Sequence, residues 1–165
     1  MNTTEILSVL NSDQAVKQIL LGVFPLDFLP VINTYPAALV INLDPSHMPG
    51  LHWVALSFNK SGTCNYFDSY GLKPSDSIKQ FKLKNAKKYV YNNKQVQRFF
   101  SSTCGHMCIY FLIWQCRGIP FANIVNSMSS DEFITGFVNA LFKLNSPVYN
   151  YNFIVNQTSI NMEKM

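Results

Sequence analysis

Cys104 has the surroundings of a reactive residue. It stands between small polar residues and an apolar run in FSSTCGHMCIYFL, residues 100–112. The run predicts a helix that begins near Cys104, and the dipole and unpaired N–H groups of a helix N-terminus favour a thiolate. This effect is worth about 0.3–1 kcal/mol, less than one pKa unit, so it cannot activate a thiol alone. Cys104 is therefore a candidate nucleophile only if a histidine lies beside it.

The three histidines differ in how well they could pair with Cys104. His106 lies two residues further along the same expected helix, where side chains point apart. His47 lies in a loop flanked by prolines. His52 opens a strand expected over residues 51–58, and a strand edge is a rigid platform for a base. His52 is the candidate base, against the simpler reading of a structural histidine.

Asp68 and Gln97 could complete such a site. If residues 51–58 and 64–68 form a hairpin around the short turn NKSG, His52 and Asp68 lie at the same open end. Asp68 could then accept a hydrogen bond from the imidazole and fix its tautomer. Gln97 precedes the cysteine by seven residues, and its amide could bind an oxyanion together with the backbone N–H of Cys104. Gln95 remains a competitor for that role.

The remaining cysteines favour packing over metal binding. Cys108 and Cys116 fall inside the expected helix and are typical of small buried hydrophobic residues. A zinc site would need Cys104, His106, Cys108 and Cys64, but this set contains no C-x-x-C pair and its members diverge along a helix. We therefore expect no metal.

Composition predicts one folded domain over residues 1–165. Apolar residues make up 48% of the sequence and charged residues 13%, about half the usual ~25%. We find no repeat, linker or low-complexity tract, no signal peptide, and no apolar run near the ~20 residues of a membrane span. The cysteines of such a chain are expected to be free thiols. The protein is accordingly expected in a reducing intracellular compartment, not secreted and not bound to a membrane.

Basic residues are concentrated in one segment. Nine of the 13 lysines and arginines lie between Lys73 and Arg117, where Asp76 is the only acid. The central run KQFKLKNAKKYVYNNKQVQR interleaves them with aromatic and amide residues, which predicts either a nucleic-acid footprint or a solvated basic face. If DNA binds, the first candidates are Lys84, Lys87, Lys88 and Arg98.

The elements needed to position these residues follow from hydrophobic periodicity and turn signals. Helices are expected from Thr3 or Thr4 to about residue 20 with a break near 11–12, over 74–81, from 103 to about 117, and over 130–144. Strands are expected over 36–43, 51–58, 63–69 and 87–93, with one more in the C-terminal tail. This order predicts an α+β fold with a small mixed or antiparallel sheet packed with helices.

The ordered set HW, FDSYG and Q-x6-CG-x-x-C resembles the adenovirus-type maturation proteases, cysteine peptidases related to the SUMO-deconjugating enzymes. LLGVFPLDFLP, AALVINLDPSHMPGLHWVAL and SMSSDEFITGFVNALFKLNSP read like segments of that family in the same order, so the resemblance covers nearly the whole chain. It implies the following roles: Cys104 as nucleophile, His52 as base, Asp68 as orienting acid, Gln97 in preference to Gln95 as oxyanion donor, and Trp53 and Gly105 in the substrate cleft.

The same resemblance implies a thiol endopeptidase that acts as a monomer and cleaves viral capsid or core precursors after small residues, typically glycine. It would act in the virion and in the viral factory or nucleus of the infected cell. The chemistry needs no cofactor, and the implied activators are DNA or a viral peptide. A disulfide-linked peptide is not expected, because the family's cysteine falls near Ala86. The alternatives are a ubiquitin or SUMO isopeptidase and a DNA-binding module with a vestigial site.

Overall fold

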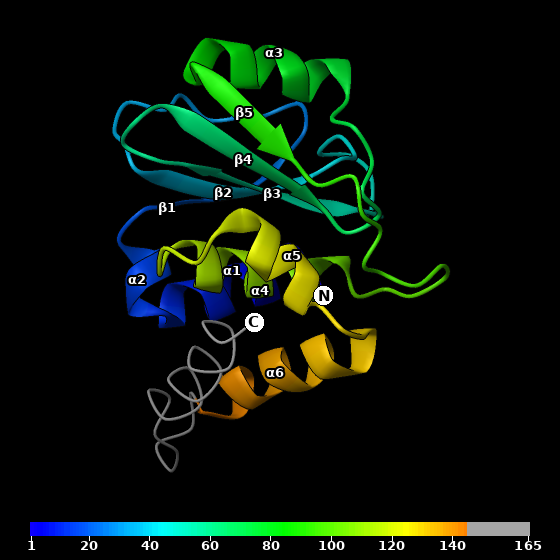
Figure 1. The fold of residues 1–165 in the computed structure, drawn as a ribbon. Coiled ribbons are helices and arrows are strands. Elements are labelled where there is room, and N and C mark those ends of the chain that lie inside the picture. The colour runs from blue at the N-terminus through cyan, green and yellow to red at the C-terminus, as the bar shows by residue number, and fades with distance from the viewer. Residues whose placement is uncertain (145–165) are drawn as a thin grey trace.

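A five-stranded mixed sheet forms the centre of the molecule (Figure 1). The computed structural model describes residues 1–144, and the side chains of 1–141. The strands lie in chain order, with the outer pairs β1–β2 and β4–β5 parallel and the inner pairs antiparallel. They are β1 (Leu20–Pro25), β2 (Ala37–Asn42), β3 (Trp53–Phe58), β4 (Thr63–Asp68) and β5 (Lys88–Tyr91).

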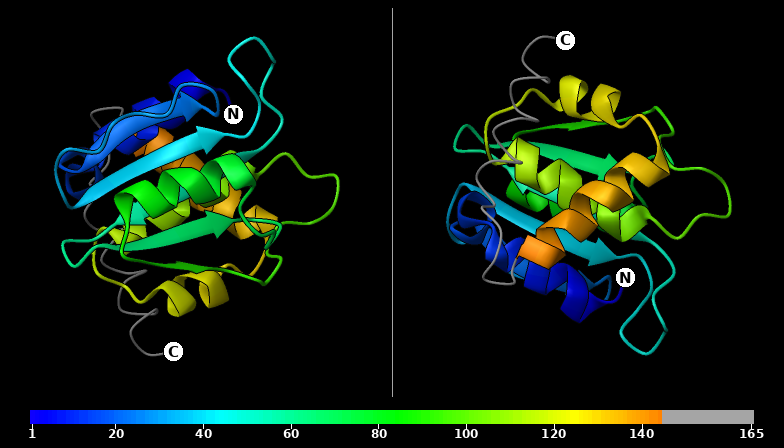
Figure 2. Two further views of the ribbon diagram at one scale, coloured as in Figure 1. Left: turned by 90° about the horizontal axis from the view of Figure 1, so that it is seen from above. Right: turned by 90° about the horizontal axis from the view of Figure 1, so that it is seen from below.

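Helices cover both faces of the sheet (Figures 1 and 2). One face carries α3 (Asp76–Asn85). The other carries α1 (Thr3–Ser12), α2 (Gln14–Lys17), α4 (Cys104–Gln115), α5 (Phe121–Ser127) and α6 (Asp131–Leu144). Each face buries its own apolar cluster, because successive strand residues point to opposite sides. The fold is therefore the expected α+β class.

Helix α4 is the central helix of the larger cluster. Ten of its 12 residues are buried, since it packs against β3 on one side and against α1, α5 and α6 on the others. A helix that is apolar all round is stable only in such a position. Its burial fixes where its first residue, Cys104, stands.

The hairpin of β3 and β4 brings two distant residues to one end of the sheet. Val54 pairs with Asp68 and Phe58 with Cys64, around a turn in which the Asn59 side chain accepts the N–H groups of Ser61 and Thr63 at 3.0 and 2.9 Å. His52 directly precedes β3, so it lies beside Asp68. The expectation of a shared open end is confirmed.

Several predicted boundaries were wrong. The first helix ends at Lys17, and residues 20–25 form β1 instead of a helix end. Gly22 and Pro25 are tolerated there because β1 is an edge strand with β2 as its partner. Asn2, in place of Thr3 or Thr4, caps α1 through a capping box with Glu5.

Two further differences concern helices. Helix α3 continues beyond the expected end to Asn85, and α5 was not predicted. The other strands and helices lie where the sequence placed them, and the strand expected in the tail lies outside the described residues. Among residues 1–144, no helix has the length and apolar character needed to cross a membrane.

Candidate active site

His52 and Asp68 form a close polar pair at the end of the hairpin. The Nε2 atom of His52 lies 2.9 Å from Oδ1 of Asp68. The Asp68 side chain is 1% exposed and also accepts the backbone N–H of Tyr70 at 2.8 Å. With Nε2 bonded to a carboxylate, the imidazole presents Nδ1 to any other partner. The pair therefore has the geometry that fixes a histidine tautomer.

Asn92 holds Asp68 from the next segment of the chain. Its side-chain Oδ1 accepts the Asp68 backbone N–H at 2.9 Å, and its Nδ2 donates to the Asp68 carbonyl at 2.6 Å and to the Lys94 carbonyl at 3.0 Å. These bonds continue the β4–β5 pairing beyond Tyr91. Asp68 is thus fixed by both its backbone and its side chain.

Cys104 is the first residue of α4 and is 6% exposed. Its helix begins without a side-chain cap, because the Thr103 hydroxyl donates to Asp131 at 2.7 Å instead of accepting from the first turn. The first N–H with a backbone partner in this helix is that of Met107, which donates to Thr103 at 3.0 Å. The N–H groups before it have no backbone partner within the helix, and that of Gly105 acts on the Cys104 sulfur.

Hydrogen-bond donors surround the sulfur of Cys104. Burial alone would raise the pKa of this thiol, but hydrogen bonds from His52 and from the backbone N–H groups of Trp53 and Gly105 lower it below its ordinary value. Each of these bonds favours the anionic form of the sulfur. The structure thus provides a site for a thiolate at the start of α4.

The pKa of His52 moves in the opposite direction. Burial would lower it, but the hydrogen bonds and negative charges of Asp68 and Cys104 raise it to about 9. A raised pKa of a histidine beside a lowered pKa of a cysteine favours the thiolate–imidazolium form of the pair. Chemically, this arrangement can attack an electrophilic carbon and deliver a proton to a leaving group.

The Gln97 amide is 2% exposed and is joined to this pair through Tyr70, whose ring stacks on the imidazole. Its Oε1 accepts the Ser69 hydroxyl at 2.6 Å, and its Nε2 donates to the Ser101 carbonyl at 2.7 Å and to the Tyr70 hydroxyl at 3.2 Å. Gln95 donates to the backbone carbonyl of Gln97 at 2.8 Å. Gln97 is therefore the inward amide, and Gln95 supports its backbone.

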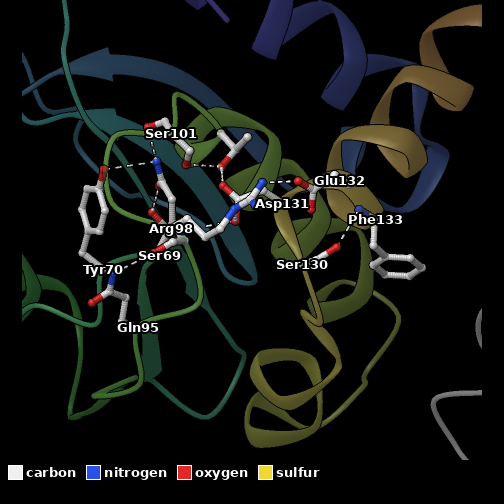
Figure 3. Close-up of polar contacts among 11 residues, drawn as sticks. Ser69, Tyr70, Gln95, Arg98, Ser101, Ser130, Asp131, Glu132 and Phe133 are labelled. Atoms are coloured by element: carbon white, nitrogen blue, oxygen red, sulfur yellow. Dashed lines mark hydrogen bonds and ion pairs between the residues drawn. The ribbon is translucent and has the colours of Figure 1, made fainter.

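Asp131 holds the loop between Gln97 and Cys104 (Figure 3). This buried carboxylate accepts the Arg98 backbone N–H at 3.2 Å and the Thr103 hydroxyl at 2.7 Å. The Arg98 side chain also pairs with Glu132 on the same helix. Helix α6 thereby fixes both ends of the loop that leads into the cysteine.

Trp53 and Gly105, predicted in the substrate cleft, both belong to the contacts that lower the pKa of the Cys104 thiol. Trp53 is 5% exposed and packs in the core beneath α4. At Gly105, an added Cβ would stand 3.1 Å from the Ile6 side chain and 3.3 Å from Met1, so the missing side chain lets α1 approach α4. The backbone N–H groups of both residues help to lower the pKa of Cys104.

The structure does not bring the four basic candidates together. Lys84 and Lys87 line a hollow near the end of α3, and Lys88 pairs with Thr63, at the end of β4 away from Asp68. Arg98 lies instead in the loop bound to Asp131. The candidate zinc set is also divided, because Cys64 packs on the α3 face of the sheet while its other members lie on α4.

Sequence reasoning missed the residues that hold the site in place: Ser69, Tyr70, Asn92 and Asp131. Tyr70 and Ser69 lie within the quoted FDSYG motif, which was a usable signal. Asn92 and Asp131 act across long stretches of chain, and no local pattern distinguishes them from other polar residues.

Comparison with known proteins agrees with this geometry. The family model described as adenovirus endoprotease matches residues 20–162. The protein named thiol protease R355 of Acanthamoeba polyphaga mimivirus is 34% identical over 117 residues, 64% of this chain and 38% of that protein. The protease of bovine adenovirus 7 is 27% identical over 128 residues, 68% of this chain and 63% of that protein.

A solved structure shares the fold. The African swine fever virus pS273R protease superposes with a TM-score of 0.67 at 15% identity, over 85% of this chain and 66% of that one. This chain spans between 38% and 63% of the length of the two curated relatives. Because the family model covers most of the sequence, the chain belongs to the adenovirus endoprotease family of viral cysteine proteases.

Proposed function

We propose that this chain is a thiol endopeptidase whose catalytic residues are Cys104, His52 and Asp68. The observation that carries the proposal is the bond of 2.9 Å between the Asp68 carboxylate and the His52 imidazole, together with the mutual effect by which His52 lowers the pKa of Cys104 and Cys104 raises the pKa of His52. Asp68 orients and stabilises the imidazolium, and the imidazolium keeps the sulfur anionic. Membership of a viral protease family supports the same reaction.

In the first half of the reaction, the Cys104 thiolate attacks the carbonyl carbon of a peptide bond. A C–S bond forms, and the carbonyl electron pair moves to oxygen beside the N–H groups at the start of α4. When the C–N bond breaks, His52 gives its proton to the leaving amine. The acyl group is then held on the sulfur as a thioester.

In the second half, the neutral imidazole takes a proton from water, and the resulting hydroxide attacks the thioester carbon. The C–S bond breaks, the acid product leaves, and Cys104 returns as a thiolate beside protonated His52. Asp68 accepts the hydrogen bond from Nε2 of the ring in both halves of the reaction.

The proposed substrates are viral capsid or core precursor proteins, cleaved after small residues such as glycine in the infected cell or virion. The viral origin of the relatives supports this substrate class. Peptides with a glycine before the cleaved bond, assayed beside ubiquitin and SUMO conjugates, test it. Faster turnover of the conjugates than of viral-type peptides would favour the isopeptidase alternative.

Iodoacetamide labelling as a function of pH tests the catalytic pair. We expect Cys104 to be alkylated below pH 7, and this reaction to slow in His52→Ala. Cys116 is the internal control, because burial raises its pKa to about 12. Equal labelling of both cysteines at low pH, or cleavage at the wild-type rate by Cys104→Ala, would overturn the proposal.

A further inference from the structure

Two adjacent phenylalanines stand exposed at the tip of the loop that leads into α4. Phe99 is 72% exposed and Phe100 is fully exposed. They occupy the centre of a tight turn, which the backbone N–H of Ser101 closes by donating to the Arg98 carbonyl at 3.3 Å. Neither ring is buried in the core, and neighbouring apolar side chains that stay exposed are typical of a binding surface.

The backbone at Phe100 is in an unfavourable conformation for its side chain. Its φ is +65°, in the left-handed region that favours glycine. A bulky residue in this region costs free energy, and such residues are concentrated at active sites and ligand-binding segments. Glycine would fit this position at a lower cost, so the fold alone does not explain a phenylalanine here.

The turn is held rigidly from both sides. Asp131 on α6 accepts the backbone N–H of Arg98 before the turn and the hydroxyl of Thr103 after it (Figure 3). The buried Gln97 amide donates to the Ser101 carbonyl at 2.7 Å. The two rings are therefore presented on a fixed backbone, which reduces the conformational entropy lost when a ligand binds them.

A row of stacked rings connects Phe99 to the catalytic histidine. The Tyr70 ring stacks on the His52 imidazole with centroids 5.0 Å apart, and the Phe99 ring stacks on Tyr70 with centroids 6.5 Å apart. The interplanar angles are 30° and 18°. An extended chain spans about 3.3–3.6 Å per residue, so Phe99 lies within about four residues of a peptide bond cleaved beside His52.

The position of this row indicates which part of a substrate meets it. His52 gives its proton to the leaving amine, so the chain after the cleaved bond must begin within hydrogen-bond reach of the imidazole. The row of rings starts at that imidazole and ends at the exposed Phe99. The leaving segment of the substrate is therefore the part that the rings can contact.

A second loop adds apolar side chains at the same end of the sheet. The loop between β2 and His52 and the loop that carries Phe99 project beyond the same end of the sheet in both views of Figure 2. Met48 is 47% exposed and Leu51 is 77% exposed on the first of these loops. The Leu51 backbone N–H donates to the Asp44 carboxylate at 2.7 Å, which holds this side chain next to His52. Exposed apolar residues thus stand on both loops that carry catalytic residues.

We propose that Phe99 and Phe100 are specificity-determining residues, which bind an apolar side chain of the substrate within about four residues after the cleaved bond. The inference rests on the proposed thiol endopeptidase function and adds a requirement on its substrate. An apolar side chain in that position covers rings that are otherwise exposed to water, and this burial is the source of the preference.

Paired peptides test the proposal. All have glycine before the cleaved bond, and each pair differs by leucine or serine at one of the four positions after it; a second series varies the positions before it. For the wild type we expect leucine to raise kcat/KM about tenfold at one or more positions after the bond, through a lower KM. In Phe99→Ser this ratio of leucine to serine peptides is expected to fall close to one.

Leu83→Ser is the control for the loss of an exposed apolar side chain. Leu83 is 63% exposed on α3 and lies beside Gly62, at the other end of the sheet. The ratio of leucine to serine peptides is expected to keep its wild-type value in this variant.

Phe100→Gly separates recognition from folding. Glycine suits a φ of +65°, so the urea midpoint of this variant is expected to equal or exceed that of the wild type. The ratio of leucine to serine peptides is expected to fall in the same variant. Alkylation of Cys104 by iodoacetamide reports separately whether the catalytic pair is intact, and if Phe99→Ser loses alkylation, the ratio in Phe100→Gly decides.

Three results would contradict this specificity: no preference of the wild type after the bond, a preference confined to the positions before it, or wild-type ratios in Phe99→Ser and Phe100→Gly. In each case the endopeptidase function stands, because the peptides are still cleaved. A wild-type protein that cleaves none of the peptides and is not alkylated at Cys104 below pH 7 would instead refute the endopeptidase function itself.

Discussion

Cys104 and Cys64 lie on opposite faces of the same sheet, and each has a basic side chain nearby. Cys104 is 6% exposed and its pKa is lowered, whereas Cys64 is fully buried and burial raises its pKa to about 12 in spite of Lys82. The difference is that Cys104 receives hydrogen bonds on sulfur from His52 and two backbone N–H groups. A nearby cation alone does not outweigh the burial of a thiolate.

Lys82 shows why the α3 face is structural. Its Nζ lies 3.5 Å from the centroid of the Tyr89 ring and 5.4 Å from that of Tyr66, and it has no hydrogen-bond partner among the described residues. Cation–π attraction holds the ammonium there, while burial lowers its pKa. This cation is engaged by aromatic faces and gives no hydrogen bond to the sulfur of Cys64.

The largest expected effect separates the two cysteines. Cys104→Ala is expected to lower kcat by at least about 10⁴-fold, because no other group supplies the nucleophile. Cys64→Ala is expected to keep wild-type cleavage and to lower the free energy of unfolding by about 1 kcal/mol, since it leaves a small cavity. Peptide cleavage and urea unfolding of both variants measure this. Loss of activity in Cys64→Ala with an intact fold would remove the distinction between the faces.

Asp68→Asn is expected to have the next largest effect. The asparagine keeps the shape but can donate to Nε2, which favours the wrong tautomer of His52 and removes the charge opposite the imidazolium. We expect kcat/KM to fall about 10²–10⁴-fold. The control is Asp76→Asn, at an exposed ion pair with Lys79 on the α3 face, which is expected to leave kcat/KM unchanged.

The pH dependence of cleavage follows from the same pair. The thiolate is lost as pH falls through the lowered pKa of Cys104, and the proton that His52 must give is lost as pH rises through about 9. The profile of kcat/KM should therefore have an alkaline limb near pH 9 that moves to lower pH in Asp68→Asn. An alkaline limb that stays in place in this variant would belong to another group.

Much of the fold could be predicted because local signals agreed with the tertiary structure. The turn Asn59–Gly62 fixed the register of β3 and β4, and this alone placed His52 beside Asp68. Strand β1 was missed because Leu20 continues the helical spacing of α1 and α2, and because an edge strand tolerates Gly22 and Pro25.

The candidate site was predictable in its residue types and less so in their hydrogen bonds. The spacing of Gln97 and Cys104 suggested an oxyanion donor, yet the bonds that occupy this amide come from Ser69, Tyr70 and Ser101. Only the three-dimensional positions of these residues show which N–H and O–H groups are free. The set of hydrogen-bond donors that remain free at the site therefore depends on the tertiary structure and cannot be predicted from residue spacing.

A smaller effect is expected where α6 supports the site. Asp131→Ala removes the acceptor for the Arg98 backbone N–H and the Thr103 hydroxyl, so it should cost about 1–3 kcal/mol of unfolding free energy and lower kcat modestly. Glu132→Gln is the matched control, because Glu132 is exposed and its ion pair is with the exposed Arg98 side chain. Thermal unfolding of both variants measures the difference, and equal changes in Tm would show that the buried carboxylate does not hold the loop.

The smallest effect on cleavage is expected at the lysine-rich hollow near the end of α3, which we propose as a DNA contact. Lys60, Lys84 and Lys87 line this hollow of about 460 Å³, and Lys88 begins the neighbouring strand. Neutralising Lys84, Lys87 and Lys88 to Gln should leave peptide cleavage without DNA unchanged, because these residues lie at the end of the sheet away from Asp68.

If all three lysines contact phosphates, the slope of log affinity for duplex DNA against log salt should fall in magnitude by about 3 in the triple variant. The single variant Lys87→Gln is compared with Lys17→Gln on α2, which removes one positive charge elsewhere. Equal salt slopes in these two variants would mean that the hollow is ordinary solvated surface and not a DNA contact.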